Sequence, residues 1–140
     1  MWLMYALITI IGYAGMDFFI KKASGKIDDY LLSTMIINFF ALLPALLMYF
    51  WLKFTNQNVL VSKEGTIFSI IAGLFIGIGT ITLIRMFSLG SNLSIGSPVV
   101  RIGTVVLTTL LGIFLLNESF ETKQIIGILL SVLGISLIVF

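Results

Sequence analysis

The stretch Thr66–Ser88 reads TIFSIIAGLFIGIGTITLIRMFS, and its single charged side chain is Arg85. A helix of about 20 residues crosses the roughly 30 Å hydrocarbon core of a bilayer. Every backbone amide inside that core must be paired within the protein, which leaves helices or a closed barrel. The apolar residues of this stretch are continuous and do not alternate with polar ones, so the pattern predicts a transmembrane helix.

The rest of the chain has the same character. Of its 140 residues, 59% are hydrophobic and 10% are charged, whereas soluble domains carry about 25% charged residues. The linkers are too short to hold a soluble domain, so we expect one all-α integral membrane domain over residues 1–140, multi-pass in the cell (inner or plasma) membrane. The expected spans are residues 2–20, 30–52, 66–88, 98–116 and 124–140.

Two prolines have positional meaning in this scheme. Ser97 followed by Pro98 fits an N-cap with proline at the first helical position, which predicts the start of the fourth span. Pro44 interrupts the second span, and its missing N–H predicts a kink there.

Several classes of function find no support in the composition. The chain has no cysteine and no histidine, and its net charge is +2. We therefore expect no metal site, no cofactor and no nucleic-acid partner. Phosphate-loop, His-Glu-x-x-His and Gly-x-Ser-x-Gly motifs are also missing from the sequence, so we do not expect an enzyme.

The charges in the loops do not favour one orientation. An odd number of spans puts the two termini on opposite sides of the membrane, and short loops rich in Lys and Arg set orientation. The lysines divide evenly: Lys53, Lys63 and Lys123 share the side of the amino terminus, and Lys21, Lys22 and Lys26 lie on the other. Either weak signals fix one topology, or the chain inserts both ways and pairs as an antiparallel dimer, as inverted repeats do within single transporters.

Three ionisable residues fall inside expected spans, where they are costly and indicate function by default. Asp17, Arg85 and Arg101 lie about one turn from the same side of the membrane. Together with Asn38 and Tyr13 they form our candidate solute-binding set, lining a polar vestibule that opens on that side. The arginines would attract an anionic group, and Asp17 would be the proton carrier.

Each of the three ionisable residues also has a purely structural interpretation. The arginines lie near enough to the interface to extend their charged groups into water. Asp17 is also spaced to pair with Lys21 at i,i+4.

Small residues recur at helix-packing spacing. Gly73 and Gly77 form a Gly-x-x-x-Gly in the third span, and Gly127, Ser131 and Gly134 follow one stripe of the fifth. Such stripes let two helix backbones approach closely. The spacing does not say whether the partner helix belongs to the same chain, but we favour a contact between subunits for the fifth span.

The last third of the chain resembles a known family. Leu116-Asn-Glu118, then Gln124-Ile-Ile-Gly127, then Gly134 resembles the signature that closes an EamA domain, the repeat unit of the drug/metabolite transporter superfamily. The stretches Ser88–Pro98 and Phe19–Ala23 resemble the family's short hairpin and the end of its first helix. Glu118 matches the family's Glu, for which the resemblance implies a role in capping or anchoring a helix.

The resemblance implies a five-helix bundle that carries small organic solutes across the bilayer by alternating access. Most members hold two such domains in inverted orientation, and this chain holds one. The leading expectation is therefore a secondary transporter or exporter that works as a dimer. The partner is either a second copy, for which an antiparallel pair of dual topology is one arrangement, or a similar chain in a heterodimer.

Two alternatives stay open. The small multidrug exporters, which remove cationic drugs, are related, but they carry an acid in the first helix where Ile11–Gly15 has none. A membrane assembly or accessory subunit that does not itself transport is the other.

Overall fold

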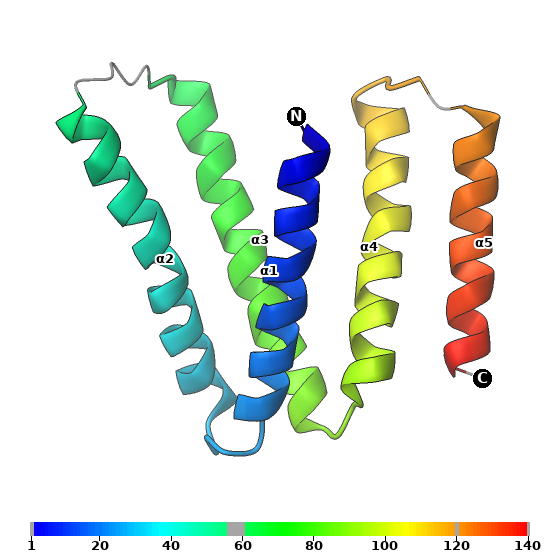
Figure 1. Ribbon diagram of the computed structural model, residues 1–140, viewed down its shortest axis with the longest axis horizontal. Helices are drawn as coiled ribbons and strands as arrows, with labels where there is room; N and C mark the ends of the chain where they lie inside the picture. Colours follow the sequence, from blue (N-terminus) through cyan, green and yellow to red (C-terminus); the bar gives the residue numbers. More distant parts are fainter. Residues whose placement is uncertain (1, 56–60, 120, 140) are drawn as a thin grey trace. The chain divides into compact units, whose positions relative to one another are not determined.

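The computed structural model describes residues 2–55, 61–119 and 121–139. These residues form five α-helices, drawn in Figure 1: α1 (Trp2–Ala23), α2 (Tyr30–Phe54), α3 (Lys63–Ser88), α4 (Leu93–Leu115) and α5 (Thr122–Val139). Each of the five is long and apolar enough to span a membrane. The protein is therefore an all-α, multi-pass membrane protein, and its surroundings are the lipid bilayer.

The expected start of the fourth span is wrong. The helix α4 begins at Leu93, and Pro98 lies inside it. Asn92 is the N-cap, and its carbonyl accepts hydrogen bonds from the amides of Ile95 and Gly96 at 3.2 and 2.8 Å. A proline in the second turn of a helix loses one hydrogen bond but keeps a helical φ, so the turn before Pro98 remains helical.

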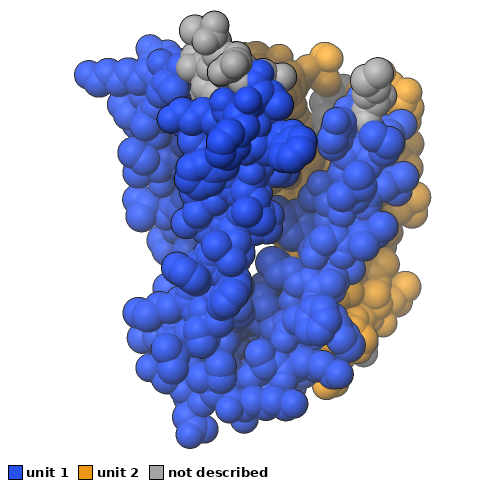
Figure 2. Space-filling view, turned by 60° about the vertical axis from the view of Figure 1, so that its left-hand side comes forward, with its two compact units in different colours: residues 1–90 blue, residues 91–140 orange. Residues whose placement is uncertain are grey.

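The chain divides into two compact units, residues 1–90 and residues 91–140, which Figure 2 shows in different colours. The first unit holds α1, α2 and α3, in which α3 packs against both α2 and α1. The second unit holds α4 and α5, which pack against each other. Each unit is described by itself below.

The core of the first unit lies at one end. Here α1 and α3 end and α2 begins (Figure 1). Ile20 on α1 and Ile84 and Phe87 on α3 are the buried hydrophobic side chains of the described residues. Farther from this end, most side chains of the three helices are exposed, as expected for helices whose apolar surfaces face lipid.

A tight turn brings α1 and α2 together at this end. Gly25 has a φ of +79°, a backbone conformation that residues with a Cβ rarely adopt. The amide of Lys26 donates to the carbonyl of Ala23 at 3.0 Å. Asp29 then caps α2, its side chain accepting from the amide of Leu31 at 2.7 Å. These local contacts fix where α2 begins relative to the end of α1.

Candidate functional site

Polar side chains are buried at the packed end of the first unit. Asp17 on α1 is 2% exposed, and Ser33 and Thr34 on α2 are 4% and 6% exposed. Burying a carboxylate or a hydroxyl costs free energy unless it is hydrogen-bonded or its charge is balanced. Polar groups gathered in the best-packed part of an otherwise apolar helical unit therefore mark the candidate site.

The polar groups of α2 are bonded along their own helix. The Thr34 hydroxyl donates to the carbonyl of Tyr30 at 2.8 Å, and the Asn38 side-chain amide donates to the carbonyl of Thr34 at 3.0 Å. These bonds hold Asn38 in one orientation. Within the described residues the Asn38 side-chain oxygen accepts no hydrogen bond, so it keeps its capacity to bind a donor.

Arg85 on α3 meets α2 through an aromatic ring. Its guanidinium carbon lies 5.1 Å from the centroid of the Tyr30 ring. A cation over an aromatic face at this distance gains about 0.5–2 kcal/mol, more as the pair is desolvated. Arg85 is exposed and Tyr30 is partly exposed, so the pair lies at the surface of the packed end.

Further basic side chains lie at the same end. The Nζ of Lys21 is 5.7 Å from the ring centroid of Phe87, and the Nζ of Lys22 is 5.3 Å from that of Phe18. Such contacts place lysine stems along apolar surface while the ammonium groups reach toward water. They are typical of a membrane–water interface, which places this end of the unit near the headgroups.

A hydroxyl pair links the ends of α1 and α3. The Ser24 hydroxyl donates to the Ser88 hydroxyl at 3.4 Å, and Ser88 itself donates to the carbonyl of Ile84 at 2.9 Å. The first contact is long for a hydrogen bond between hydroxyl groups, so it contributes little free energy. The contact nevertheless shows that the end of α1 and the end of α3 lie close together.

Three of the five residues predicted to bind solute lie in the first unit, one on each of its helices. Asp17 on α1 and Arg85 on α3 lie near its packed end, and Asn38 lies two turns into α2. Tyr13 lies one turn before Asp17 on α1 and is 50% exposed. Arg101 lies on α4, in the second unit, where its side chain is partly exposed.

The expected open vestibule does not describe the surroundings of Asp17, because this carboxylate is 2% exposed. Burial comes from packing between helices, which span lengths and turn counts do not determine.

Sequence reasoning missed Ser33, Thr34 and Tyr30. Ser33 and Thr34 are adjacent polar residues one turn into an apolar span, and that was the available signal. The role of Tyr30 depends on the neighbouring helix α3, so nothing in the sequence pattern of α2 pointed to it.

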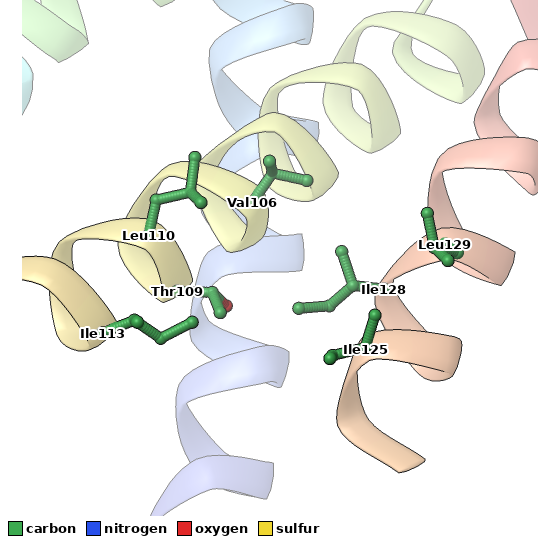
Figure 3. A pocket seen from close by; sticks show the side chains of 7 residues that line it. All are labelled: Val106, Thr109, Leu110, Ile113, Ile125, Ile128 and Leu129. Carbon is green, nitrogen blue, oxygen red and sulfur yellow. The ribbon is translucent and has the colours of Figure 1, made fainter. Parts of the chain in front are cut away.

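The second unit offers a groove of a different kind. It lies between α4 and α5, has a volume of about 240 Å³ and exposes only apolar surface (Figure 3). The lining residues are Val106, Thr109, Leu110, Ile113, Ile125, Ile128 and Leu129. Such a groove suits an apolar occupant such as an acyl chain, and it presents no polar group to orient a solute.

The small residues of the predicted packing stripes face no close neighbour. A Cβ added at Gly73 or Gly77 would meet no atom within 4 Å among the described residues of its own unit, and the same is true at Gly127 and Gly134. Helix contacts within the units therefore do not use these stripes. Pro44 lies inside α2, which runs as one helix from Tyr30 to Phe54.

Within the described part of the chain, no group of three or more Asp or Glu side chains is arranged to hold a metal ion. The acidic side chain of the candidate site is Asp17, and the other residues of the site carry hydroxyl, amide and guanidinium groups. This set of groups fits an organic solute with polar groups.

The comparisons with known proteins point in the same direction. The model of the EamA-like transporter family matches residues 1–140, a range that includes all five helices. No curated protein and no solved structure gives a significant match.

Proposed function

The chain belongs to the EamA-like transporter family, so it is a membrane transporter and not an enzyme, and we propose that it moves small organic metabolites by secondary transport with alternating access. The observation that carries this proposal is the packed polar end of the first unit. Polar and ionisable side chains inside membrane spans are costly, and they mark solute or ion pathways. Here a carboxylate that is 2% exposed occupies that position.

We assign solute binding to Asp17, Asn38, Arg85, Arg101 and Tyr13. Asn38 is oriented by its bond to the carbonyl of Thr34, and an amide held in this way selects ligands by hydrogen bonding. Asp17 would take a proton or pair with a cationic group of the solute. The arginines would hold an anionic group, and Tyr13 would provide apolar contact.

The closed packing around Asp17 fits one step of an alternating-access cycle. In such a cycle the pathway is shut on one side of the membrane while it opens on the other. The buried side chains Asp17, Ile20, Ser33, Ile84 and Phe87 would form the closure. Opening would require α1 and α3 to separate near Ser24 and Ser88, where the linking hydrogen bond is long.

A second repeat would complete the pathway, and we propose that a second copy of the chain, or a similar chain, supplies it in the cell membrane. Two features support pairing. No residue of α5 is buried in the described structure, and its Gly127–Gly134 stripe meets no neighbour within its own unit. The even division of lysines between the two sides favours an antiparallel arrangement.

The test is solute flux into liposomes that contain the purified protein, measured with and without a pH gradient. Amino acids, sugars and cationic drugs are the first solutes to try. Asp17→Asn should reduce flux at least about tenfold, equivalent to 1.4 kcal/mol or more. Glu121→Gln is the matched control, because Glu121 is exposed and pairs with Lys123 at 2.7 Å outside the candidate site.

Three results would count against the proposal. Absence of flux for every solute would favour an accessory subunit. Normal flux after changing Asp17, Arg85 and Arg101 together would remove these three residues from the solute pathway. Flux restricted to cationic drugs, with Asp17 essential, would favour the activity of a small multidrug exporter.

A further inference from the structure

Arg85 has an unusual set of contacts for an arginine on a membrane span. Among the described residues its guanidinium forms no ion pair and no hydrogen bond, and the Tyr30 ring is its one recorded interaction. Arg85 lies one turn before the end of α3 at Ser88. Its five N–H donors therefore remain available at a level of the protein close to the headgroups.

This guanidinium is exposed, so water or an oxyanion can reach it. Its planar donors match the two oxygens of a carboxylate or phosphate, and such charge-assisted pairs are among the stronger hydrogen bonds in proteins. Tyr30 cannot satisfy them, because a ring face attracts the positive charge without accepting each N–H in its plane. The contact with Tyr30 thus restrains Arg85 while leaving its edge free for a ligand.

The acidic side chain nearest to Tyr30 in sequence does not take this role. Asp29 accepts a hydrogen bond from the amide of Leu31 at 2.7 Å as the N-cap of α2. It is not within ion-pair distance of Arg85 in the described structure. The neighbouring charged groups at this end include Lys21 and Lys22, whose positive charge adds to the attraction for an anion.

We propose that Arg85, held by the ring of Tyr30, is an oxyanion-binding site that takes a carboxylate or phosphate group. The proposal names the ligand chemistry of one part of the candidate site, and it rests on the proposed function only where it identifies the ligand as a transported solute. A lipid headgroup offers the same chemistry. Binding at Arg85 is defined without reference to transport, so it is testable separately.

The chain has two arginines, Arg85 and Arg101, which makes an arginine-specific reagent informative. Phenylglyoxal modification is followed at each arginine by mass spectrometry of fragments from the purified protein. The probes are inorganic phosphate and acetate, compared with chloride at equal ionic strength. We expect each probe to slow modification of Arg85 by about threefold or more, because a bound oxyanion covers the guanidinium edge.

Variants of the ring test whether Tyr30 positions the arginine. Tyr30→Leu should weaken the protection of Arg85, and Tyr30→Phe should retain it because the ring face is kept. Tyr49→Leu is the matched control, since the ring of Tyr49 lies 5.8 Å from the Nζ of Lys53 at the opposite end of α2. If Tyr30→Leu does not fold, the proposal still depends on protection in the wild type and in Tyr30→Phe.

The membrane environment distinguishes the two sources of oxyanion. If the ligand is a solute, Arg85 reacts readily both in maltoside micelles and in phosphatidylcholine nanodiscs until phosphate or acetate is added. If the ligand is a lipid headgroup, the nanodiscs protect Arg85 without any added probe, and the micelles do not. An unchanged rate at Arg85 with every probe and in both environments would overturn the proposal.

The proposed function fails by a different result. If no solute is transported but phosphate or acetate still protects Arg85, the proposed transport function is wrong and the oxyanion site is supported. Flux that persists with an unprotected Arg85, and after Arg85→Gln, would remove the oxyanion site and leave transport in place.

Discussion

The Glu118 carboxylate folds back onto Gly112, so that a Cβ added to this glycine would lie 2.6 Å from Glu118 Oε2. The backbone also folds back onto the end of α4, where the amide of Glu118 donates a hydrogen bond to the carbonyl of Gly112 at 3.1 Å. Asn117, with a φ of 53°, turns the chain between them. Gly112 thus provides the space in which the chain closes the end of α4, a geometry that supports an anchoring role for Glu118.

This relationship predicts that the effect of Gly112→Ala depends on Glu118. In the wild type, the new methyl group displaces the Glu118 carboxylate, which reduces the helix-propensity gain of about 1 kcal/mol. In a Glu118→Ala background nothing is displaced, and the same change should stabilise the protein. A double-mutant cycle on the free energy of unfolding in mixed micelles should give a coupling of about 0.5 kcal/mol. Equal effects in both backgrounds would show that Glu118 does not hold this position.

The second prediction concerns the backbone conformation of Asn117. Its φ of 53° lies in the left-handed region, which glycine adopts freely, asparagine tolerates and β-branched residues avoid. Asn117→Gly should therefore leave the midpoint of unfolding unchanged or raise it slightly. Asn117→Val should destabilise by about 1–2 kcal/mol. Asn92→Val is a useful comparison, because Asn92 has a φ of −71° and makes no side-chain cap bond; a loss as large as that of Asn117→Val would contradict the prediction.

The sequence sufficed for the number and nature of the helices, because long apolar runs have few alternatives in a bilayer. It was less reliable for the start of α4. Ser97-Pro98 is a good start signal, but Asn92 is another, and helix formation extends to the earlier cap when one proline costs a single hydrogen bond. A helix start after Asn92 and one after Ser97 both agree with helix-capping preferences, so these preferences do not decide between the two.

The sequence also suggests part of the candidate site. Asp17, Asn38 and Arg85 are predicted because polar residues stand out in apolar spans, and their role in solute binding stays a prediction. Their burial differs widely, from the enclosed Asp17 to the exposed Arg85, and this depends on how α1, α2 and α3 pack. The pairing of Arg85 with Tyr30 joins residues far apart in the chain, which no local pattern encodes.

A third prediction separates the structural and binding roles of Asn38. Its amide donates to the carbonyl of Thr34 within α2, and that carbonyl belongs to a helix that stays intact without the bond. Asn38→Leu should therefore change the free energy of unfolding by less than about 1 kcal/mol, the usual scale of polar contacts inside membranes. Flux should nevertheless fall, because the solute loses a hydrogen-bonding partner. A large loss of stability, or unchanged flux with folded protein, would remove Asn38 from the binding site.

The final prediction concerns pairing through α5. A Cβ at Gly127 or Gly134 meets nothing within its own unit, so replacing both with leucine should leave the helical content of the protein unchanged. The added side chains should instead keep a second helix from approaching the stripe. Gly103→Leu on α4 is the matched control, because Gly103 also has open space around it and lies on no predicted stripe.

Cross-linking between single introduced cysteines measures this contact, because the native chain has no cysteine. Leu130 and Leu137 lie on the same side of α5 as the glycines and are 63% and 85% exposed. Two antiparallel copies of α5 that cross near its middle would bring Leu130→Cys close to its counterpart and keep two Leu137→Cys residues apart. A parallel pair would cross-link at both positions. The proposed antiparallel dimer therefore requires a cross-link at position 130 alone, which the double leucine variant abolishes and Gly103→Leu preserves.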